Sequence, residues 1–286
     1  MAGGIPTIVG YGGYDGKYIY SFNAPYLYQI NPKTLAVVAS FDSGVSGAQG
    51  VGFTFDGTYV YLLLSPVIYK IDPASMSQVD NTTIPNTTAS TTANNMIYDG
   101  TYIYFITVTV IYQIDPATLA TINTLSAPTG YFDGGTYDGS YLYIGWENST
   151  ASTYGVYQVS PETMKIVASA SLPTNPLSMI YDGISIYAAS TTAIYQIDPA
   201  SMSVVNSLSI ANYTGTAVVG LAFDGKYLYV EYNPTSAQIT LYKLNPKTLT
   251  TVSSLTIALA PPYEALTGNN FLIVPSLKYA VSWAFP

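Results

Sequence analysis

Carboxylates are the side chains of this sequence best suited to acid–base chemistry. The 286 residues contain no His and no Cys, and all 8 basic residues are Lys. This composition excludes an imidazole base, a thiolate nucleophile, a His or Cys metal site and an Arg anion clamp. A glycosidase or lyase would need two acids roughly 5–10 Å apart. The acids outside the repeated turns described below are Asp42, Asp80, Asp133, Glu147, Glu231 and Glu264, and Glu162 lies in a turn.

Aromatic residues accompany several of these acids. Tyr and Trp combine a large rigid area with a polar tip, so beside carboxylates and amides they suit stacking on sugar rings or contact with a protein. A chain with 29 Tyr also exposes Tyr without any function, so no single residue is decisive. The residues predicted to bind a ligand are Tyr131, Phe132, Asp133, Trp146, Glu147, Tyr154, Tyr213, Glu231 and Tyr232.

A repeat of roughly 42 residues must position these side chains. The phrase Asp-Gly-x-Tyr-x-Tyr begins at Asp15, Asp56, Asp99, Asp138 and Asp224, with a Ser-containing variant at Asp182. Successive copies are 41, 43, 39, 44 and 42 residues apart. A second phrase, Ile-Tyr-Gln-Ile-Asp-Pro-x-Thr/Ser-Leu/Met, interleaves with the first over residues 26–35, 67–76, 110–119, 155–164, 193–202 and 240–249.

Each repeat is predicted to form four short strands. The apolar run before Asp-Gly forms the first strand, and the Tyr-x-Tyr segment after it, with aromatic and β-branched residues at alternating positions, forms the second. Ile-Tyr-Gln-Ile forms the third strand, and the residues after Pro form the fourth. Asp-Gly favours a type I′ hairpin turn, and Asp/Asn-Pro-x-Thr favours a turn because Pro fixes φ. Four antiparallel strands in about 40–45 residues describe a propeller blade. The sequence therefore predicts a single all-β propeller domain over residues 1–286.

The repeat resembles that of the YVTN-type seven-bladed propellers. The resemblance rests on Tyr-Asp-Gly-Thr-Tyr-Ile-Tyr at 98–104 and Ile-Tyr-Gln-Ile-Asp-Pro at 111–116, and it covers nearly the whole chain. The Val-Ala-Asn motif that is usual in the family is replaced here by Asp-Gly turns and Tyr pairs, so the match is to the architecture rather than to a subfamily. It implies an archaeal or bacterial cell-surface protein, or a component of an archaeal virus, and no particular activity.

Seven blades are expected from the length, and six blades are the alternative. Six copies carry both phrases, and an eroded copy at 267–273 lies 44 residues after the sixth. Residues 263–286 would supply most of a seventh blade, and residues 1–7 would add its missing outer strand. In the alternative, the C-terminal residues form a flap on a six-bladed ring.

The strand order determines on which face of the ring each connection between strands lies. Both repeated turns fall on one face, and the variable connections fall on the other, where binding residues of scaffolded folds concentrate. The variable connections are 42–50, 80–95, 126–135, 146–154, 210–217, 231–238 and 258–264. They contain all the candidate residues and four N-glycosylation triplets, which favours a surface outside the cell. These triplets begin at Asn81, Asn86, Asn148 and Asn212. Since Glu147 and Glu231 belong to different repeats, they are not expected to form a catalytic pair.

The composition limits partners and environment. Charged residues make up only 8% of the chain and the net charge is −8, which argues against nucleic acid as a partner. No run of about 18 apolar residues predicts a membrane span, and the N-terminus does not read as a signal peptide. Sparse ions suit an acidic exterior, where carboxylates are neutralised near their reference pKa of about 3.9–4.3.

The sequence therefore predicts a non-enzymatic binding or structural propeller without cofactor or metal. It is expected on an extracellular surface or in a virion, where its variable face contacts a host-surface glycan or protein subunits of an assembly. Two alternatives remain open: a cytosolic scaffold for protein–protein contact, and a glycosidase or lyase that uses a carboxylate pair.

Overall fold

The computed structural model describes residues 12–23, 25–45, 51–85, 87, 93–210, 220–235 and 238–258. These residues form six antiparallel sheets of four strands each. The first sheet contains β1 (Gly12–Tyr14), β2 (Ile19–Asn23), β3 (Tyr26–Ile30) and β4 (Val37–Asp42). The second contains β5 (Val51–Phe55), β6 (Val60–Leu64), β7 (Val67–Asp72) and β8 (Ser77–Thr83). The third contains β9 (Ala93–Tyr98), β10 (Ile103–Thr107), β11 (Val110–Ile114) and β12 (Thr121–Ser126).

The other three sheets have the same order. The fourth contains β13 (Tyr131–Tyr137), β14 (Leu142–Asn148), β15 (Thr153–Ser160) and β16 (Lys165–Leu172). The fifth contains β17 (Ser178–Tyr181), β18 (Ile186–Ala189), β19 (Ala193–Asp198) and β20 (Ser203–Ser209). The sixth contains β21 (Gly220–Phe223), β22 (Leu228–Thr235), β23 (Gln238–Leu244) and β24 (Thr251–Ala258).

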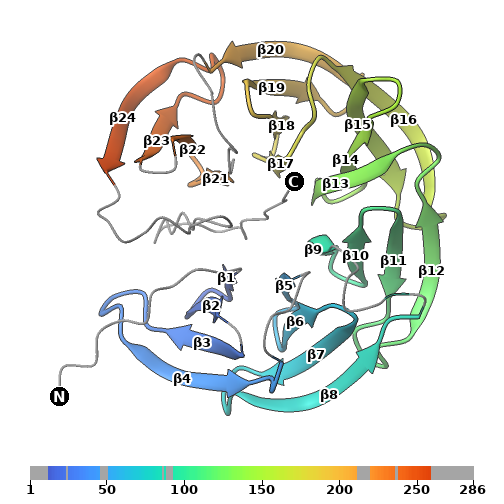
Figure 1. Cartoon of the computed structure of the whole chain (residues 1–286), viewed down its shortest axis with the longest axis vertical. Coiled ribbons are helices and arrows are strands. Elements are labelled where there is room, and N and C mark those ends of the chain that lie inside the picture. Colours follow the sequence, from blue (N-terminus) through green and yellow to red (C-terminus); the bar gives the residue numbers. More distant parts are fainter. Residues whose placement is uncertain are drawn as a thin grey trace.

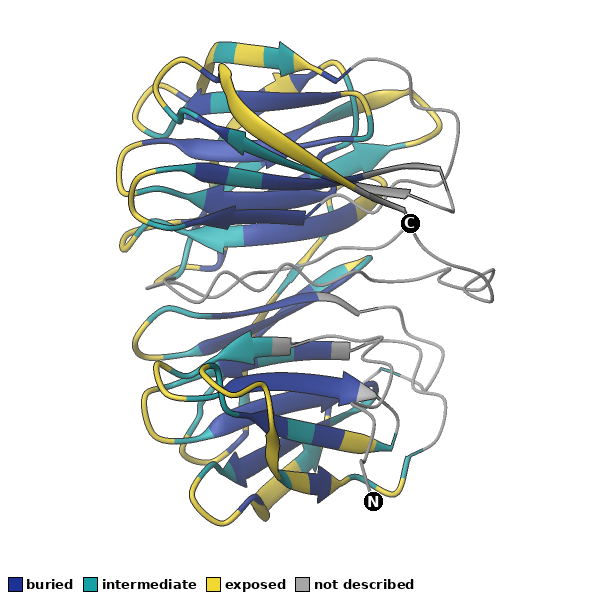
Figure 2. Ribbon diagram, turned by 90° about the vertical axis from the view of Figure 1, so that its left-hand side faces the viewer, coloured by how far each residue is buried: buried dark blue, intermediate teal, exposed yellow. Residues whose placement is uncertain are grey.

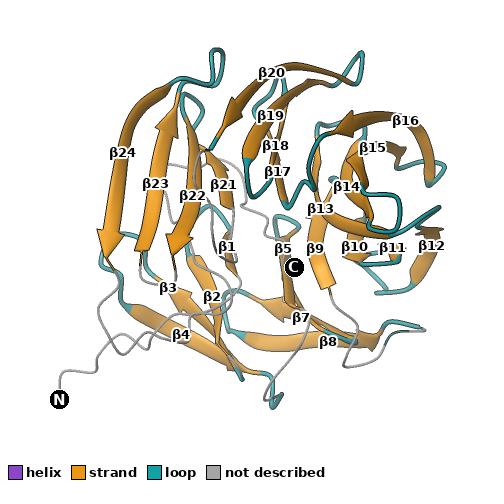
Figure 3. Ribbon diagram, turned by 45° about the horizontal axis from the view of Figure 1, so that its top comes forward, coloured by secondary structure: helices purple, strands orange, loops and turns teal. Residues whose placement is uncertain are grey.

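The sheets are the blades of a β-propeller. They follow one another around a common centre, with the first strand of each sheet innermost and the fourth at the rim (Figure 1). Figure 3 shows the four strands of the sixth blade, β21 to β24, lying side by side. The predicted fold and four-stranded blade are confirmed. Among the described residues no helix is long and apolar enough to cross a membrane.

The number of blades differs from the main expectation. The described residues form six blades, which was the alternative, and not seven. Residues 1–7 and 263–286, to which the seventh blade was assigned, lie outside the described residues.

The Asp-Gly turns are four-residue loops capped by the Asp side chain. Asp99 is typical: its Oδ1 accepts bonds from the backbone N–H groups of Thr101 and Tyr102, both at 2.7 Å, and its Oδ2 accepts one from the Tyr104 hydroxyl at 2.7 Å. The same three bonds recur in every described copy. Only the Gly has positive φ, between +88° and +99°. The type I′ prediction is therefore wrong, because these Asp residues stay outside the left-handed region and act as acceptors.

The turn between the third and fourth strands ends in a Leu or Met with left-handed backbone. The φ values of these six residues lie between +49° and +56°. Such a conformation costs a bulky residue about 1–2 kcal/mol, but the side chain gains burial. Leu119, for example, packs among residues of the preceding blade such as Tyr61 and Leu63. Met76, Met164, Met202 and Leu249 do the same in the other blades. Leu35 of the first blade is instead 52% exposed.

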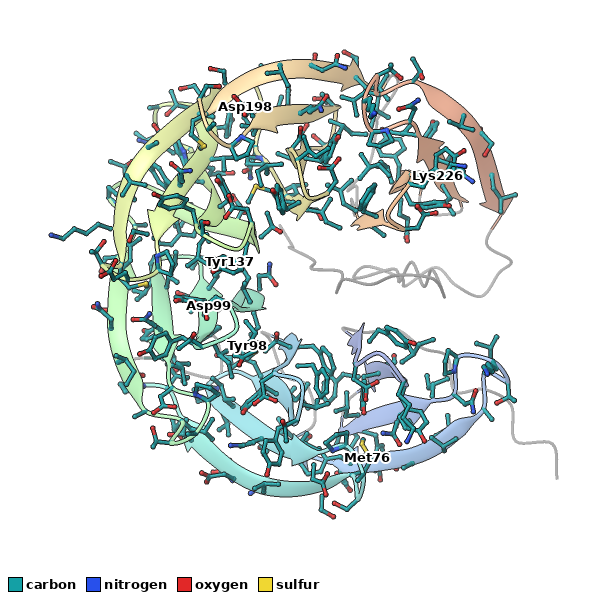
Figure 4. All side chains as sticks on the ribbon, turned by 180° about the vertical axis from the view of Figure 1, so that it is seen from behind. Met76, Tyr98, Asp99, Tyr137, Asp198 and Lys226 are labelled. Atoms are coloured by element: carbon teal, nitrogen blue, oxygen red, sulfur yellow. The ribbon has the colours of Figure 1, made fainter. Side chains whose placement is uncertain are left out.

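Hydrophobic clusters lie between consecutive blades. The described residues form five such clusters, one at each of the five contacts from the first blade to the sixth. Figure 2 shows the buried strands at the middle of the ring and exposed turns along one face. In Figure 4, Tyr98, Asp99 and Tyr137 lie near the centre, whereas Met76 and Asp198 lie nearer the rim. The two kinds of repeated turn therefore form an inner and an outer circle.

A polar contact joins each of these blade pairs as well. In the first, third and fourth blades the Gln of the third strand donates from Nε2 to the Pro carbonyl of the next blade's outer turn. Gln113, for example, donates to Pro161 at 2.9 Å and also to the Tyr104 hydroxyl at 3.0 Å. The equivalent bonds are Gln29 to Pro73, Lys70 to Pro116, Gln158 to Pro199, and Tyr187 to Pro246. The repeated Gln and Pro residues therefore form contacts between blades in addition to the turns.

Candidate functional site

The fourth blade, like the sixth, has long middle strands that extend at the variable face. Its two middle strands, β14 and β15, have 7 and 8 residues, whereas β6 and β10 have 5 and β18 has 4. Residues 131–133, 146–148 and 153–154, which the sequence placed in loops, are therefore strand residues. In a strand, the pairing determines which of these side chains lie on the same face. A loop assignment makes no such prediction.

One row of side chains crosses this end of the blade. Tyr131 pairs with Glu147, and Glu147 pairs with Tyr154. Directly paired residues project from the same face of an antiparallel sheet. Tyr131 is 47% exposed, and Glu147 and Tyr154 are half-buried. Three of the predicted ligand-binding residues are therefore brought together on one face.

The neighbouring row packs on the opposite face. Trp146 stacks on Tyr157 with ring centroids 5.1 Å apart and planes 16° apart, and the fully buried Phe132 meets the same Tyr edge-on at 6.5 Å. Gly155 leaves room for the indole, since a Cβ at this position would lie 2.8 Å from Trp146 Nε1. Phe132, which the sequence placed in a variable loop, is thus a core residue.

Two carboxyls and an amide form a cluster between the fourth and fifth blades. Asp133 lies in a bulge of β13, where the register shifts between Phe132 and Gly135, and Glu147 lies near the end of β14. Asn175, in the connection to β17, donates from Nδ2 to Glu147 Oε2 at 2.5 Å and also hydrogen-bonds Asp133. Asp133 is only 7% exposed. Asp133 Oδ2 and Asn175 Oδ1 are buried without a hydrogen-bond partner.

This environment changes the protonation of Asp133. Burial first, and then the charge of Glu147, raise the pKa of the Asp133 carboxyl to about 7, although the hydrogen bond from Asn175 acts against them. The expectation that acids would not pair concerned Glu147 and Glu231, which belong to different repeats, and the pair of Asp133 and Glu147 in one blade was not considered. Asn175 was not singled out. The Asp-Gly-Gly of residues 133–135 was the available signal, because a glycine in a strand often marks a bulge.

The acid of the sixth blade lies apart from this cluster. Glu231 in β22 is 3% exposed, its Oε1 has no hydrogen-bond partner, and burial raises the pKa of its carboxyl to about 7. Tyr232 packs in the cluster between the fifth and sixth blades. Both residues were predicted to contact a ligand, and both are instead buried. Tyr213 lies outside the described residues.

The predicted glycosylation positions are divided. Asn81 is exposed in the outermost strand β8 and not in a variable loop. Asn148 ends β14, and its Oδ1 accepts a bond from the Ala151 backbone N–H at 3.2 Å. Asn86 and Asn212 lie outside the described residues.

The six repeated four-stranded blades of the described residues define a β-propeller repeat protein. No protein-family model matches the chain, and no curated protein sequence matches it. Among solved structures it is similar to the hydrazine synthase of Kuenenia stuttgartiensis, with a TM-score of 0.62 and 15% identity over 80% of this chain and 74% of that one. Identity at this level supports the propeller fold and carries no argument about activity.

Proposed function

We propose that the chain is a non-enzymatic binding propeller that contacts its partner through the variable end of the fourth blade. The observation that supports this is the row formed by Tyr131, Glu147 and Tyr154 across strands β13, β14 and β15. Two Tyr rings flank a carboxylate that is already held by an amide, and this combination suits stacking on and hydrogen bonding to a sugar or a polar protein surface. The partner is a host-surface glycan or a subunit of a virion or cell envelope.

The geometry supports binding better than catalysis. A general acid must come within hydrogen-bond reach of the reacting atom. Asp133, the acid with the raised pKa, is 7% exposed, and its Oδ2 is buried, so a polysaccharide cannot reach that oxygen without rearrangement. A carboxylate-pair glycosidase or lyase is therefore the second candidate, supported by the proximity of Asp133 and Glu147.

The extracellular or virion location and the YVTN-type relationship are also part of this proposal. The exposed Asn81 and the sparse charge support a surface outside the cell. Mass spectrometry of protein from its native source separates this location from a cytosolic scaffold. Sugar on Asn81 or Asn148 is expected, and unmodified Asn at both positions together with a lysate partner would favour the scaffold.

The finer expectation of seven blades is retained as a proposal. The equivalents of Leu35 in the later blades are each covered by the preceding blade, whereas Leu35 is exposed. We propose that a further blade covers Leu35.

Binding to immobilised glycans and to envelope fractions tests the proposed function. Tyr131→Ala and Tyr154→Ala are each expected to weaken binding roughly tenfold, the loss of one aromatic contact of about 1.4 kcal/mol. Tyr141→Ala is the matched control, because Tyr141 is a 38% exposed Tyr beside the Asp-Gly turn of the same blade. Equal losses in all three variants would reject this surface. Turnover of a polysaccharide that is lost in Glu147→Gln would favour the second candidate.

A further inference from the structure

The cluster of Asp133, Glu147 and Asn175 leaves oxygen atoms without partners in a buried place. Asp133 Oδ2 and Asn175 Oδ1 are both inaccessible and accept no hydrogen bond. Buried polar atoms are normally satisfied, and a buried pair of carboxyls is costly unless something neutralises the charge. The Asn175 N–H₂ group donates hydrogen bonds to both carboxyls, and it leaves the negative charge in place.

We propose that Asp133, Glu147 and Asn175 bind a calcium ion between the fourth and fifth blades. All three side chains offer oxygen, the donor atom that hard divalent cations prefer. Rotation of the Asn175 amide by 180° would turn Oδ1 toward the Glu147 carboxylate, where an ion would separate the two oxygens. This departs from the sequence expectation of no metal, and it does not depend on the proposed function.

The positions of the three residues explain why an ion would fit here. The bulge at Asp133 and Gly134 opposes two residues of β13 to Gly145 alone on β14. Gly145 keeps the place open, since a Cβ there would lie 2.9 Å from the Pro176 carbonyl oxygen and 3.3 Å from Asp133 Cβ. That carbonyl is a further oxygen at the edge of the cluster.

Calcium fits these donors better than magnesium. Among the described residues no three acids gather, so the protein supplies two carboxyls and neutral oxygens, and water must complete the shell. Calcium accepts 6–8 oxygens in flexible geometry, whereas magnesium requires a near-ideal octahedron. A ligand set drawn from two strands of one blade and the connection to the next suits the more tolerant ion.

Binding is expected to stabilise the ring, because an ion would tie the connection between the fourth and fifth blades to the fourth blade. The two carboxyls belong to the fourth blade and Asn175 to the connection that leads to the fifth. Thermal unfolding is measured after EDTA treatment and again with millimolar CaCl₂. A free concentration about 100 times Kd is expected to raise Tm by roughly 5 °C. Asp133→Asn is expected to abolish the shift. Glu231→Gln is the matched control, because Glu231 is a buried acid with an unpartnered oxygen outside the cluster, and this variant must retain the shift.

A second readout keeps the proposal testable if Asp133→Asn does not fold. Terbium replaces calcium at oxygen sites, and Trp146, adjacent to Glu147 in sequence, is placed to sensitise its luminescence. The signal is expected in the unmodified protein, to fall on addition of calcium, and to be lost in Glu147→Gln. No calcium-dependent Tm shift, or an equal shift in Asp133→Asn, would overturn the proposed calcium site. Unchanged glycan binding in the Tyr131→Ala and Tyr154→Ala variants, with the calcium shift intact, would reject the proposed function alone.

Discussion

At the scale of single residues, buried carboxyls and capped turns set the response to pH. Burial raises the pKa of Glu231 to about 7, well above its ordinary value of 4.5. Hydrogen bonds from the Ala74 and Ala117 backbone N–H groups lower the pKa of Asp72 and Asp115 respectively. The first effect favours the folded state in acid, and the second favours it above the ordinary Asp pKa. Together they place the best stability at mildly acidic pH.

Glu231→Gln should flatten the alkaline side of the stability profile. Because the folded-state pKa is raised, the contribution of Glu231 is complete below about pH 4.5 and is lost as the pH rises through about 7. Urea unfolding at pH 5 and pH 8 is the measurement. The unmodified protein is expected to lose on the order of 3 kcal/mol more than Glu231→Gln between these two pH values. Equal losses would mean that Glu231 titrates normally.

Tyr104→Phe tests the cap of the Asp-Gly turn. The Tyr104 hydroxyl donates to Asp99 Oδ2 at 2.7 Å and accepts from Gln113 at 3.0 Å in a fully buried position. Its removal leaves a carboxylate oxygen without this donor, so a loss of about 1–3 kcal/mol in the free energy of unfolding is expected. Tyr141→Phe, at an exposed Tyr beside the equivalent turn of the fourth blade, should change it by less than about 0.5 kcal/mol. Similar values for both variants would contradict a specific role for the cap.

At the scale of strands and blades, a hydrogen bond from the third strand of one blade to the outer turn of the next blade recurs around the ring. Gln113→Ala removes the donor to the Pro161 carbonyl, and a loss of about 1–2 kcal/mol is expected in urea unfolding. Gln78→Ala, at an exposed Gln of β8, is the control and should be nearly neutral. Lys70→Gln should be tolerated, since Lys70 already donates to Pro116 from the equivalent position. A neutral Gln113→Ala would mean that apolar packing alone holds adjacent blades together.

The strands and turns of the blades could be predicted from the sequence, whereas the cluster at the end of the fourth blade could not. Strand order and turn positions followed from the repeat, because Asp-Gly and Asp/Asn-Pro turns and alternating Tyr are local signals. The Asp133–Glu147 cluster did not follow, since it depends on a two-residue bulge and on strands that run past Trp146. Glu231 and Tyr232 were misplaced for the same reason: β22 continues to Thr235, so residues expected in a loop lie in the core.

At the scale of the whole molecule, the first blade tests how the ring is completed. Leu119 and Leu35 end equivalent turns with nearly equal φ of +56° and +55°, but Leu119 is 2% exposed and Leu35 is 52% exposed. Leu119→Ala should cost about 2–4 kcal/mol, because a buried leucine leaves a cavity. If a seventh blade covers Leu35, Leu35→Ala should cost a similar amount. A change below about 0.5 kcal/mol, as for an exposed side chain, would instead support a six-bladed ring. Because the substitution and the backbone conformation are the same at both sites, the difference in unfolding free energy reports on the covering blade alone.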